Sequence, residues 1–403
     1  REAARERLAH EVVQRVERGE AHLREGHHRS AIELLEQAVR LAREVDDRRL
    51  EATALGSLGS ARYALGQFEQ AAEDYQRALT LAHELGDRKG EGNRLANLGL
   101  VYYALGQMQA AVAYMQKALA IVREHGNRIG EIELLGNLGR AYCALRQARP
   151  AIDAYQRALA IAREHDDRAT EGELLADLGD AYLSMGRAGG HGAQTRTALD
   201  TYQQALSIAR ELGDRRAEGN RLGRLGSAYH ALGDWQQAIQ VYEQALAIAR
   251  EVDDARGEGN RLNNLGNVYY ALGRDPKKAR PSAIFVGRQH EEAAAAHYRT
   301  AADYYKRALV IARAVNDRRA EGNRLANLGN TYSALAHVQH DGSEAANYRT
   351  AQETYRAAVA IAREMGDRRA EADRLGSLGN THYALGEIEA AIECYEPALA
   401  LSR

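Results

Sequence analysis

The sequence predicts an all-α fold built from repeated pairs of antiparallel helices. One phrase recurs along the chain, Asp-Arg followed by Leu-x-x-Leu-Gly-x-x-Tyr-x-Ala-Leu-Gly and then Ala-x-x-x-Tyr-x-x-Ala-Leu. Its Leu, Ala and Tyr positions follow one another at three- and four-residue intervals, which is typical of one face of an amphipathic helix. The 403 residues include only 4 Pro, and 45% are hydrophobic, a balance that favours helices over disorder.

The starts of the phrase set the boundaries of the repeats. They are Asp47, Asp87, Asn127, Asp167, Asp214, Asp254, Asp317 and Asp367, so a unit of 40 residues is lengthened in three places by 7, 23 and 10 residues. A degenerate first copy precedes them. We therefore predict a single array over 1–403 with nine repeats, at 1–46, 47–86, 87–126, 127–166, 167–213, 214–253, 254–316, 317–366 and 367–403, and with inserts near 187–196, 274–297 and 337–347.

Residues between the helices predict the turns. Gly86 is suited to the left-handed conformation that ends a helix, and Asp87 is suited to accept hydrogen bonds from the free amides that begin the next one. Where that glycine is absent, the sequence has Asp46, Asp166, Asp253 or Asn316. Asp and Asn adopt positive φ more readily than most non-glycine residues, so we expect the same turn there.

Small and large residues alternate in a pattern that resembles the tetratricopeptide repeat (TPR). Leu98-Gly99, Tyr102, Ala111 and Ala118 carry the resemblance in one repeat, and it extends over nearly the whole chain. The 40-residue period resembles the TPR arrays of the Pins/LGN adaptors, of kinesin light chain and of bacterial signalling proteins. The resemblance implies a right-handed α-solenoid, or superhelix, of about nine helix-turn-helix repeats that binds peptides or proteins. Three residues depart from the pattern: Arg62, Met115 and His382.

Asparagine recurs on the first helix of the repeats, at positions that packing does not require. In such a solenoid the first helices line the concave face, so these side chains are candidates for ligand contact. A carboxamide both donates and accepts, which suits it to hold the backbone of an extended peptide. The alternative is that these residues bond adjacent helices or reflect repeat duplication. The predicted peptide-binding residues are Asn93, Asn97, Asn137, Asn220, Arg224, Asn260, Asn264, Asn267, Asn323, Asn327, Asn330 and Asn380.

Charge on the first helices is uneven. Repeats four and five are acidic there, with Glu133, Glu173, Asp177 and Asp180, whereas later repeats have Arg221, Arg224, Arg261, Arg324 and Arg374. An extended ligand with basic and acidic ends would complement this pattern. The alternative is that these arginines pair within the chain with Glu218, Glu258, Glu321 and Glu371, which precede several of them by three residues.

The longest insert is a second candidate for partner docking. Lys277, Lys278 and Arg280 lie between two prolines, and an apolar run that includes Phe285 follows. Such a segment is suited to dock a partner or to fold back into the groove, and packing on the neighbouring helix is the alternative.

Other functional classes find little support in the sequence. It has no phosphate-binding loop, nucleophile elbow or paired-cysteine motif, so we predict no enzyme, no cofactor and no metal, and we expect His27, His28, His337 and His340 to be solvent-exposed. A net charge of -2 and the acidic fourth and fifth repeats argue against nucleic acid. No run of about 20 apolar residues is present, so we expect no membrane contact and a cytoplasmic protein.

Two alternative functions remain open. The array would serve as a structural spacer or a self-assembling rod if its ends stack on other copies, because the last helix lacks a polar capping helix. It would instead be the ligand-sensing arm of a larger, STAND-like signalling protein if another domain is attached. The favoured interpretation is a scaffold for a protein or peptide ligand.

Overall fold

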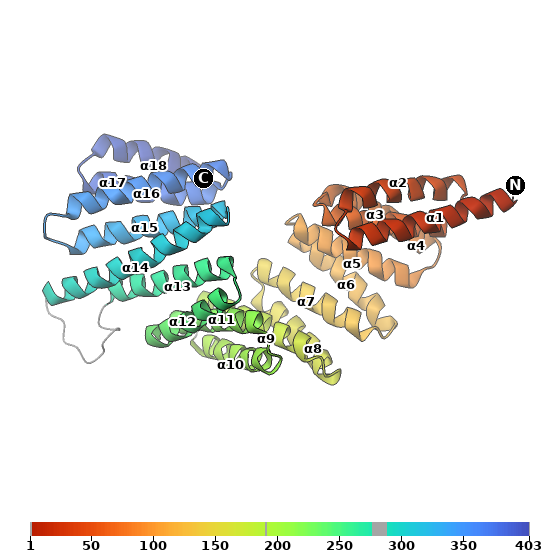
Figure 1. Cartoon of the computed structure of the whole chain (residues 1–403), viewed down its shortest axis with the longest axis horizontal. Helices are drawn as coiled ribbons and strands as arrows, with labels where there is room; N and C mark the ends of the chain where they lie inside the picture. Colours follow the sequence, from red (N-terminus) through yellow and green to blue (C-terminus); the bar gives the residue numbers. More distant parts are fainter. Residues whose placement is uncertain (1, 190–191, 276–287, 403) are drawn as a thin grey trace. The chain divides into compact units, whose positions relative to one another are not determined.

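The computed structural model describes residues 2–189, 192–275 and 288–402, and these residues form eighteen α-helices and no strand (Figure 1). The chain is therefore an all-α solenoid, as the sequence predicts. The first nine helices are α1 (Glu2–Arg24), α2 (His28–Glu44), α3 (Arg48–Ala64), α4 (Phe68–Glu84), α5 (Arg88–Ala104), α6 (Met108–Glu124), α7 (Arg128–Ala144), α8 (Ala148–Glu164) and α9 (Arg168–Gly189). The others are α10 (Gly192–Glu211), α11 (Arg215–Leu232), α12 (Trp235–Glu251), α13 (Ala255–Arg274), α14 (Arg288–Ala314), α15 (Arg318–Val338), α16 (Glu344–Glu364), α17 (Arg368–Ala384) and α18 (Ile388–Ser402).

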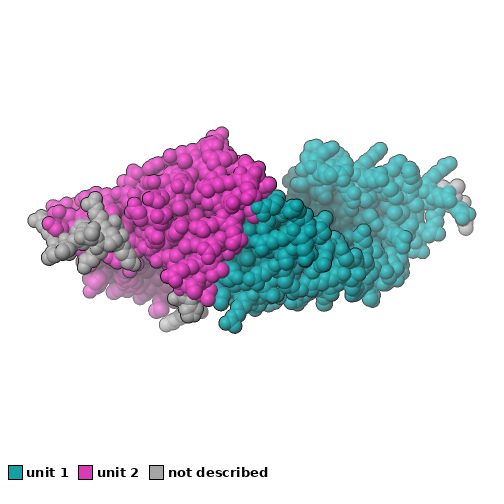
Figure 2. All heavy atoms as spheres, turned by 90° about the horizontal axis from the view of Figure 1, so that it is seen from below, with its two compact units in different colours: residues 1–188 teal, residues 189–403 magenta. Residues whose placement is uncertain are grey.

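The helices gather into two compact units, residues 1–188 and 189–403, which Figure 2 colours separately. Odd-numbered helices are the first helices of the repeats, and even-numbered helices are the second. Within the first unit α1 also contacts α3, α3 contacts α5, and α5 contacts α7. Within the second unit α11 contacts α13, and α15 contacts α17. In these pairs the first helices of adjacent repeats thus lie close together.

Turn residues between repeats adopt the predicted conformations. Gly86 has φ 65°, and the substitutes Asp46, Asp166, Asp253 and Asn316 have φ between 51° and 58°. The side chain of Asp87 accepts a hydrogen bond from the amide of Gly90 at 2.9 Å, which caps α5. Arg146 also has positive φ, at 58°, in a turn within a repeat, although an arginine does not predict this conformation.

Glycine recurs where the two helices of a repeat cross, because a larger side chain would meet the partner helix. A Cβ added at Gly226 would lie 2.7 Å from the ring of Tyr242, and one added at Gly99 would lie 2.5 Å from Cγ of Met115. Tyr242 and Met115 are both almost fully buried. Methionine at this site therefore fills the same space as the tyrosine of other repeats, which explains that departure from the pattern.

Two other departures are accompanied by compensating partners. Arg62 donates hydrogen bonds to Asp74 at 2.7 Å and to Glu36 at 2.8 Å, and Asp74 is buried. His382 lies 2.5 Å from a carboxylate oxygen of Glu387 through its Nδ1 atom. Each replacement of tyrosine thus brings an acidic partner with it, as a buried polar side chain requires.

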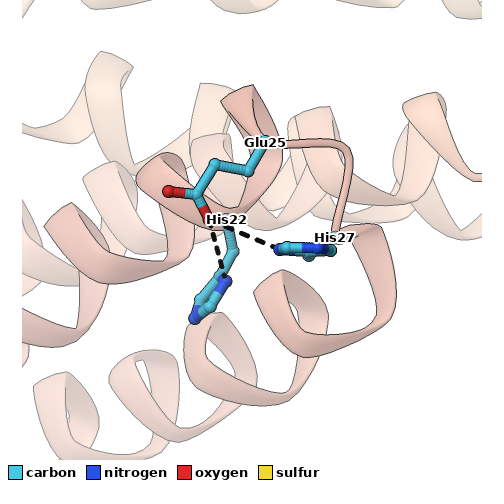
Figure 3. A group of neighbouring side chains, drawn as sticks. All are labelled: His22, Glu25 and His27. Carbon is cyan, nitrogen blue, oxygen red and sulfur yellow. Dashed lines mark ion pairs between the residues drawn. The ribbon is translucent and has the colours of Figure 1, made fainter.

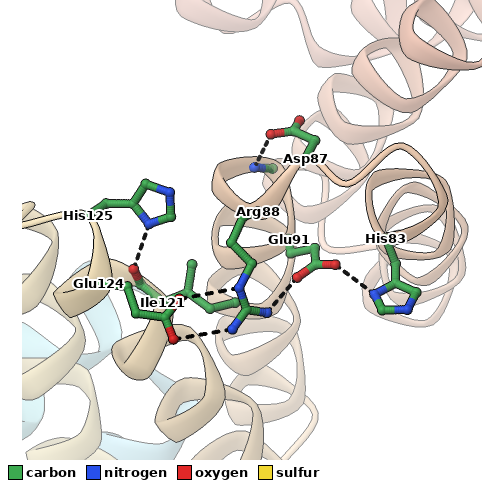
Figure 4. Close-up of polar contacts among 8 residues, drawn as sticks. His83, Asp87, Arg88, Glu91, Ile121, Glu124 and His125 are labelled. Carbon is green, nitrogen blue, oxygen red and sulfur yellow. Dashed lines mark hydrogen bonds and ion pairs between the residues drawn. The ribbon is translucent and has the colours of Figure 1, made fainter.

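Neighbouring repeats are joined by a recurring ion-pair network, which Figure 4 shows around Arg88. Arg88 donates to Glu91 at 2.7 Å and to Glu124, at the end of the second helix of its own repeat, at 3.3 Å, while Nδ1 of His83 in the preceding repeat lies 2.7 Å from Glu91. Glu91 is only 7% exposed. Its counterparts Glu131, Glu171, Glu218 and Glu321 are buried too, and each lies between an arginine of the preceding helix and an arginine of its own helix.

These glutamates predict a loss of stability in acid. The hydrogen bond from Arg88 lowers the pKa of Glu91 below 4.5; for Glu218, burial raises the pKa, but the hydrogen bonds from Arg210 and Arg215 outweigh it and lower the pKa. A carboxylate whose pKa is lower in the folded state than in the unfolded state stabilises the fold fully at pH values above its unfolded-state pKa. It loses that contribution as the pH falls through its folded-state pKa. We expect the melting temperature to fall steadily from about pH 5 to pH 3.

Circular dichroism melts across this pH range test the expectation. Glu218→Gln is expected to melt lower at pH 7 and to lose less on acidification, whereas Glu389→Gln, at an exposed site, should follow the wild-type curve. A wild-type melting temperature that does not change between pH 5 and pH 3 would show that these pairs contribute no net stability.

The inserts lie beside longer helices. α14 has 27 residues, and α9, α15 and α16 have 22, 21 and 21, compared with 17 in most repeats. Both the first and the second helix of these repeats are lengthened. Lys277, Lys278, Arg280 and Phe285 lie outside the described residues. None of the helices in the described ranges is long and apolar enough to cross a membrane.

Candidate functional site

The predicted peptide-binding residues all lie on first helices, but their environments differ. Asn93, Asn220, Asn260, Asn323, Asn330 and Asn380 are exposed, and Asn97, Asn137, Arg224, Asn264, Asn267 and Asn327 are half-buried. Several of them bond to the chain itself, so the alternative interpretation holds for those residues, and ligand contact by the others stays a prediction.

One set of asparagines accepts hydrogen bonds from arginines of the next repeat. Arg261 donates to Asn220 at 2.9 Å, Arg324 to Asn260 at 2.8 Å, and Arg374 to Asn323 at 2.9 Å. Arg324 and Arg374 are buried, and burial lowers the pKa of both. These arginines therefore join repeats, and they form little of a basic ligand surface.

A second set bonds within its own repeat. Asn267, Asn330 and Asn380 each accept a hydrogen bond from the tyrosine that crosses their helix, at 2.8, 2.6 and 2.8 Å. Asn327 donates to Asn263 of the preceding repeat at 3.0 Å. Asn93, Asn97 and Asn264 make no side-chain hydrogen bond with any described residue, so their amide groups are available to a ligand.

The glutamates that the sequence offered as partners for the later arginines bond elsewhere. Glu218 and Glu321 are held by the recurring network, Glu258 pairs with Arg250 at 2.7 Å, and Glu371 pairs with Arg363 at 2.6 Å. The intramolecular pairing therefore joins arginines at the end of the preceding second helix to these glutamates. Sequence spacing on a single helix did not reveal it because the partners lie across the turn.

A cavity of about 630 Å³ lies between α7 and α9, both within the first unit. Its apolar wall is made by Ile129, Ile132 and Leu174, and Ile129 is 71% exposed. The polar lining includes the predicted residue Asn137 and three of the four acidic residues noted in repeats four and five, all but Asp180. The polar lining residues are Glu133, Asn137, Arg140, His165, Asp167, Thr170, Glu173 and Asp177.

Leucine at position 174 explains why the cavity exists. Five other repeats have arginine at this point of the first helix, whereas repeat four has Leu134 and repeat two has Ala54. Two of these arginines cover a small residue of the preceding first helix: a Cβ added at Gly223 would lie 2.6 Å from Cζ of Arg261, and Arg94 covers Gly56 in the same way. At Gly136 the nearest atom is Cδ2 of Leu174, at 3.8 Å. The shorter side chain leaves the space open. The sequence contained this signal as a missing arginine, which becomes meaningful only once the packing is known.

The cavity has an excess of negative charge. Arg140 donates to Asp177 and to Asn137, each at 3.3 Å, so one carboxylate is already paired. Glu133 and Glu173 line the cavity, are exposed, and form no ion pair with any residue in the described ranges. A site with an apolar wall and two unpaired carboxylates is suited to a cationic group that has an apolar stem.

Solved structures with similar folds are known, although no curated protein matches the sequence. RapI in its apo form is 14% identical, with 97% of each chain covered and a TM-score of 0.63. A signal transduction ATPase with numerous domains (STAND) from Pyrococcus horikoshii, which has a tetratricopeptide repeat sensor, is 16% identical over 92% of this chain and 52% of that one, with a TM-score of 0.58. The TPR-like repeats of a putative kinesin light chain from Podosopora anserina are 20% identical over 50% of this chain and 97% of that one, with a TM-score of 0.43.

Family models match most of the sequence. One tetratricopeptide repeat model matches residues 12–84, 93–164, 193–251 and 220–281, and a second matches residues 372–403. These matches cover helix pairs in both units and include the residues on which the resemblance was based. The chain belongs to the tetratricopeptide repeat family.

Proposed function

We propose that this chain is a non-catalytic scaffold that holds an extended peptide, or an extended segment of a partner protein, along its first helices through Asn and Arg side chains. The observation that carries the proposal is the cavity between α7 and α9, with its unpaired carboxylates Glu133 and Glu173. In the same unit, Asn97 occupies the position on α5 that Asn137 occupies on α7. An amide free to bond thus lies one repeat before the cavity.

The cavity defines the chemistry of the anchor. A lysine or arginine side chain of the ligand would pack its methylene groups on Ile129, Ile132 and Leu174 and place its charge between Glu133 and Glu173. Charge-assisted hydrogen bonds to carboxylates are about twice as strong as neutral ones. Asn97 would bond the peptide backbone, since a carboxamide offers both a donor and an acceptor.

A pair of fluorescent peptide libraries tests this function. Both libraries consist of extended decapeptides rich in Gly and Ala. One library has a fixed central Arg and the other has a fixed central Glu. Binding is measured by fluorescence anisotropy. We expect the Arg library to bind and the Glu library to bind at least tenfold more weakly. The double variant Glu133→Gln/Glu173→Gln is expected to bind the Arg library about tenfold more weakly than the wild type, because two charge-assisted hydrogen bonds become neutral ones.

The matched control is Glu389→Gln/Glu393→Gln, which changes the net charge equally at exposed sites on α18 and should leave binding unchanged. If both libraries bind equally well, or if the control weakens binding as much as the cavity variant does, the basic anchor is wrong. If neither library binds, the spacer or self-assembling rod takes the place of the scaffold.

A sensing arm is the second candidate, and it is a special case of the first. The fold likeness to the STAND protein, which covers 52% of that longer chain, favours it. In a sensor, binding of the anchor peptide would alter an attached domain. The library experiment identifies the ligand that either arrangement needs.

A further inference from the structure

We propose that His22, Glu25 and His27 form a binding site for a divalent transition-metal ion such as Zn²⁺. The three side chains lie at the turn between α1 and α2, and Figure 3 shows both imidazole rings directed at the same carboxylate. Neither the family nor the proposed scaffold function requires a metal here. The site is argued from the turn geometry, the ligand distances and one unsatisfied nitrogen atom.

The backbone brings the ligands together. Gly26 has φ 80°, and the amide of His27 donates to the carbonyl of His22 at 2.8 Å, so the turn is a Schellman motif. This motif places the side chains of His22 and His27, the residues at the two ends of its six-residue turn, next to each other. Their separation is therefore set by the turn and does not depend on a bound ion.

The residue types at this turn differ from those of other repeats. In the next three repeats the place of His27 is taken by glutamine, and the place of Glu25 is taken by leucine. Two of these repeats have tyrosine in the place of His22. The residues are Gln67, Gln107 and Gln147; Leu65, Leu105 and Leu145; and Tyr102 and Tyr142. The same turn forms in those repeats without histidine or glutamate. The turn itself thus does not require these three side chains, which together are a common set of zinc ligands.

The distances suit a tetrahedral ion. Nδ1 of His27 lies 3.3 Å and Nδ1 of His22 lies 3.7 Å from Oε2 of Glu25, and one ligand atom from each residue lies within 4.8 Å of the others. Bonds of about 2.0–2.1 Å in a tetrahedron put neighbouring ligand atoms about 3.3–3.4 Å apart. Small rotations of exposed side chains would complete the geometry and leave a fourth position for water.

One nitrogen lacks a hydrogen-bond partner. Nδ1 of His22 is buried, although the rest of that side chain is partly exposed, and it makes no hydrogen bond with the described residues. A buried nitrogen without a partner is unfavourable, and a metal bond at that atom would satisfy it. The ion would also join the end of α1 to the start of α2 and so clamp the first helix pair.

Isothermal titration calorimetry of ZnCl₂ into the full chain, with any affinity tag removed, tests the site. We expect one zinc ion per chain, weaker binding at lower pH as protons compete, and much weaker binding of Mn²⁺. The variants His22→Tyr, Glu25→Leu and His27→Gln each introduce the residue that other repeats have at this turn. Each is expected to bind zinc at least tenfold more weakly, and zinc should raise the melting temperature of the wild type but not of these three variants.

His125→Gln removes an exposed histidine at another turn and is expected to bind zinc as the wild type does. The proposal is overturned if the wild type binds no zinc, or if the turn variants, shown to fold by circular dichroism, keep the wild-type affinity. Because His22, Glu25 and His27 do not line the α7–α9 cavity, the result is independent of the peptide experiment.

Discussion

Replacing Arg62 with methionine is expected to lower the free energy of unfolding of the second repeat by about 3–5 kcal/mol. The change leaves the carboxylate of Asp74, only 2% exposed, without its guanidinium partner. Burial already raises the pKa of Asp74 even with Arg62 beside it. Hydrogen exchange of peptides from α3 and α4 measures the loss, because repeats of a solenoid unfold partly as local units.

Two further measurements separate the buried charge from a simple loss of packing. Arg62→Tyr/Asp74→Ala recreates the pair that repeat four has as Tyr142 and Ala154, and it should regain most of the stability. In Arg62→Met the deficit should shrink at low pH, because a carboxyl whose folded pKa is raised above its unfolded value binds its proton more tightly in the folded state. A loss below about 1 kcal/mol would mean that water reaches Asp74.

Replacing Leu174 with arginine is expected to abolish binding of the Arg library, with a loss of at least about a hundredfold in affinity, or about 2.8 kcal/mol. The new side chain would cover Gly136, as Arg261 covers Gly223 and Arg94 covers Gly56. It would fill the cavity and bring a positive charge to Glu133 and Glu173. Because the array already accepts arginine at this position in other repeats, the chain should fold with little change in melting temperature.

Leu174→Met is the matched control, since it changes the shape of the wall but adds no charge and costs less than about 1.5 kcal/mol. It should retain binding within a fewfold of the wild type, again by fluorescence anisotropy. Unchanged binding by Leu174→Arg would place the anchor outside the cavity and leave only the asparagine surface as a candidate.

Local rules made the fold predictable. Each turn residue adopts its conformation for a reason that lies within a few positions of it, so Gly86 and Asp46 could be interpreted from sequence alone. The recurring phrase then identified the helix pairs. Arg146 was missed because arginine has no intrinsic preference for positive φ, and only the surrounding turn imposes it.

The candidate site was only partly predictable. The asparagines could be listed, but sequence spacing could not separate Asn323, which accepts from Arg374, from Asn97, which makes no side-chain hydrogen bond with the described residues. Likewise, the sequence analysis expected His27 only to be solvent-exposed, and the turn that brings His22 and His27 toward Glu25 became evident in three dimensions.

The sequence by itself determined the all-α repeat architecture, its family and the residues that form its turns, because these depend on local conformational preferences and a periodic pattern. Only the tertiary structure decided which polar side chains form hydrogen bonds between repeats and where a cavity remains. A single leucine in place of arginine opens the α7–α9 cavity, and that effect depends on Gly136, 38 positions earlier in the chain. Packing across repeats is a non-local property, so a single-sequence pattern cannot fix it.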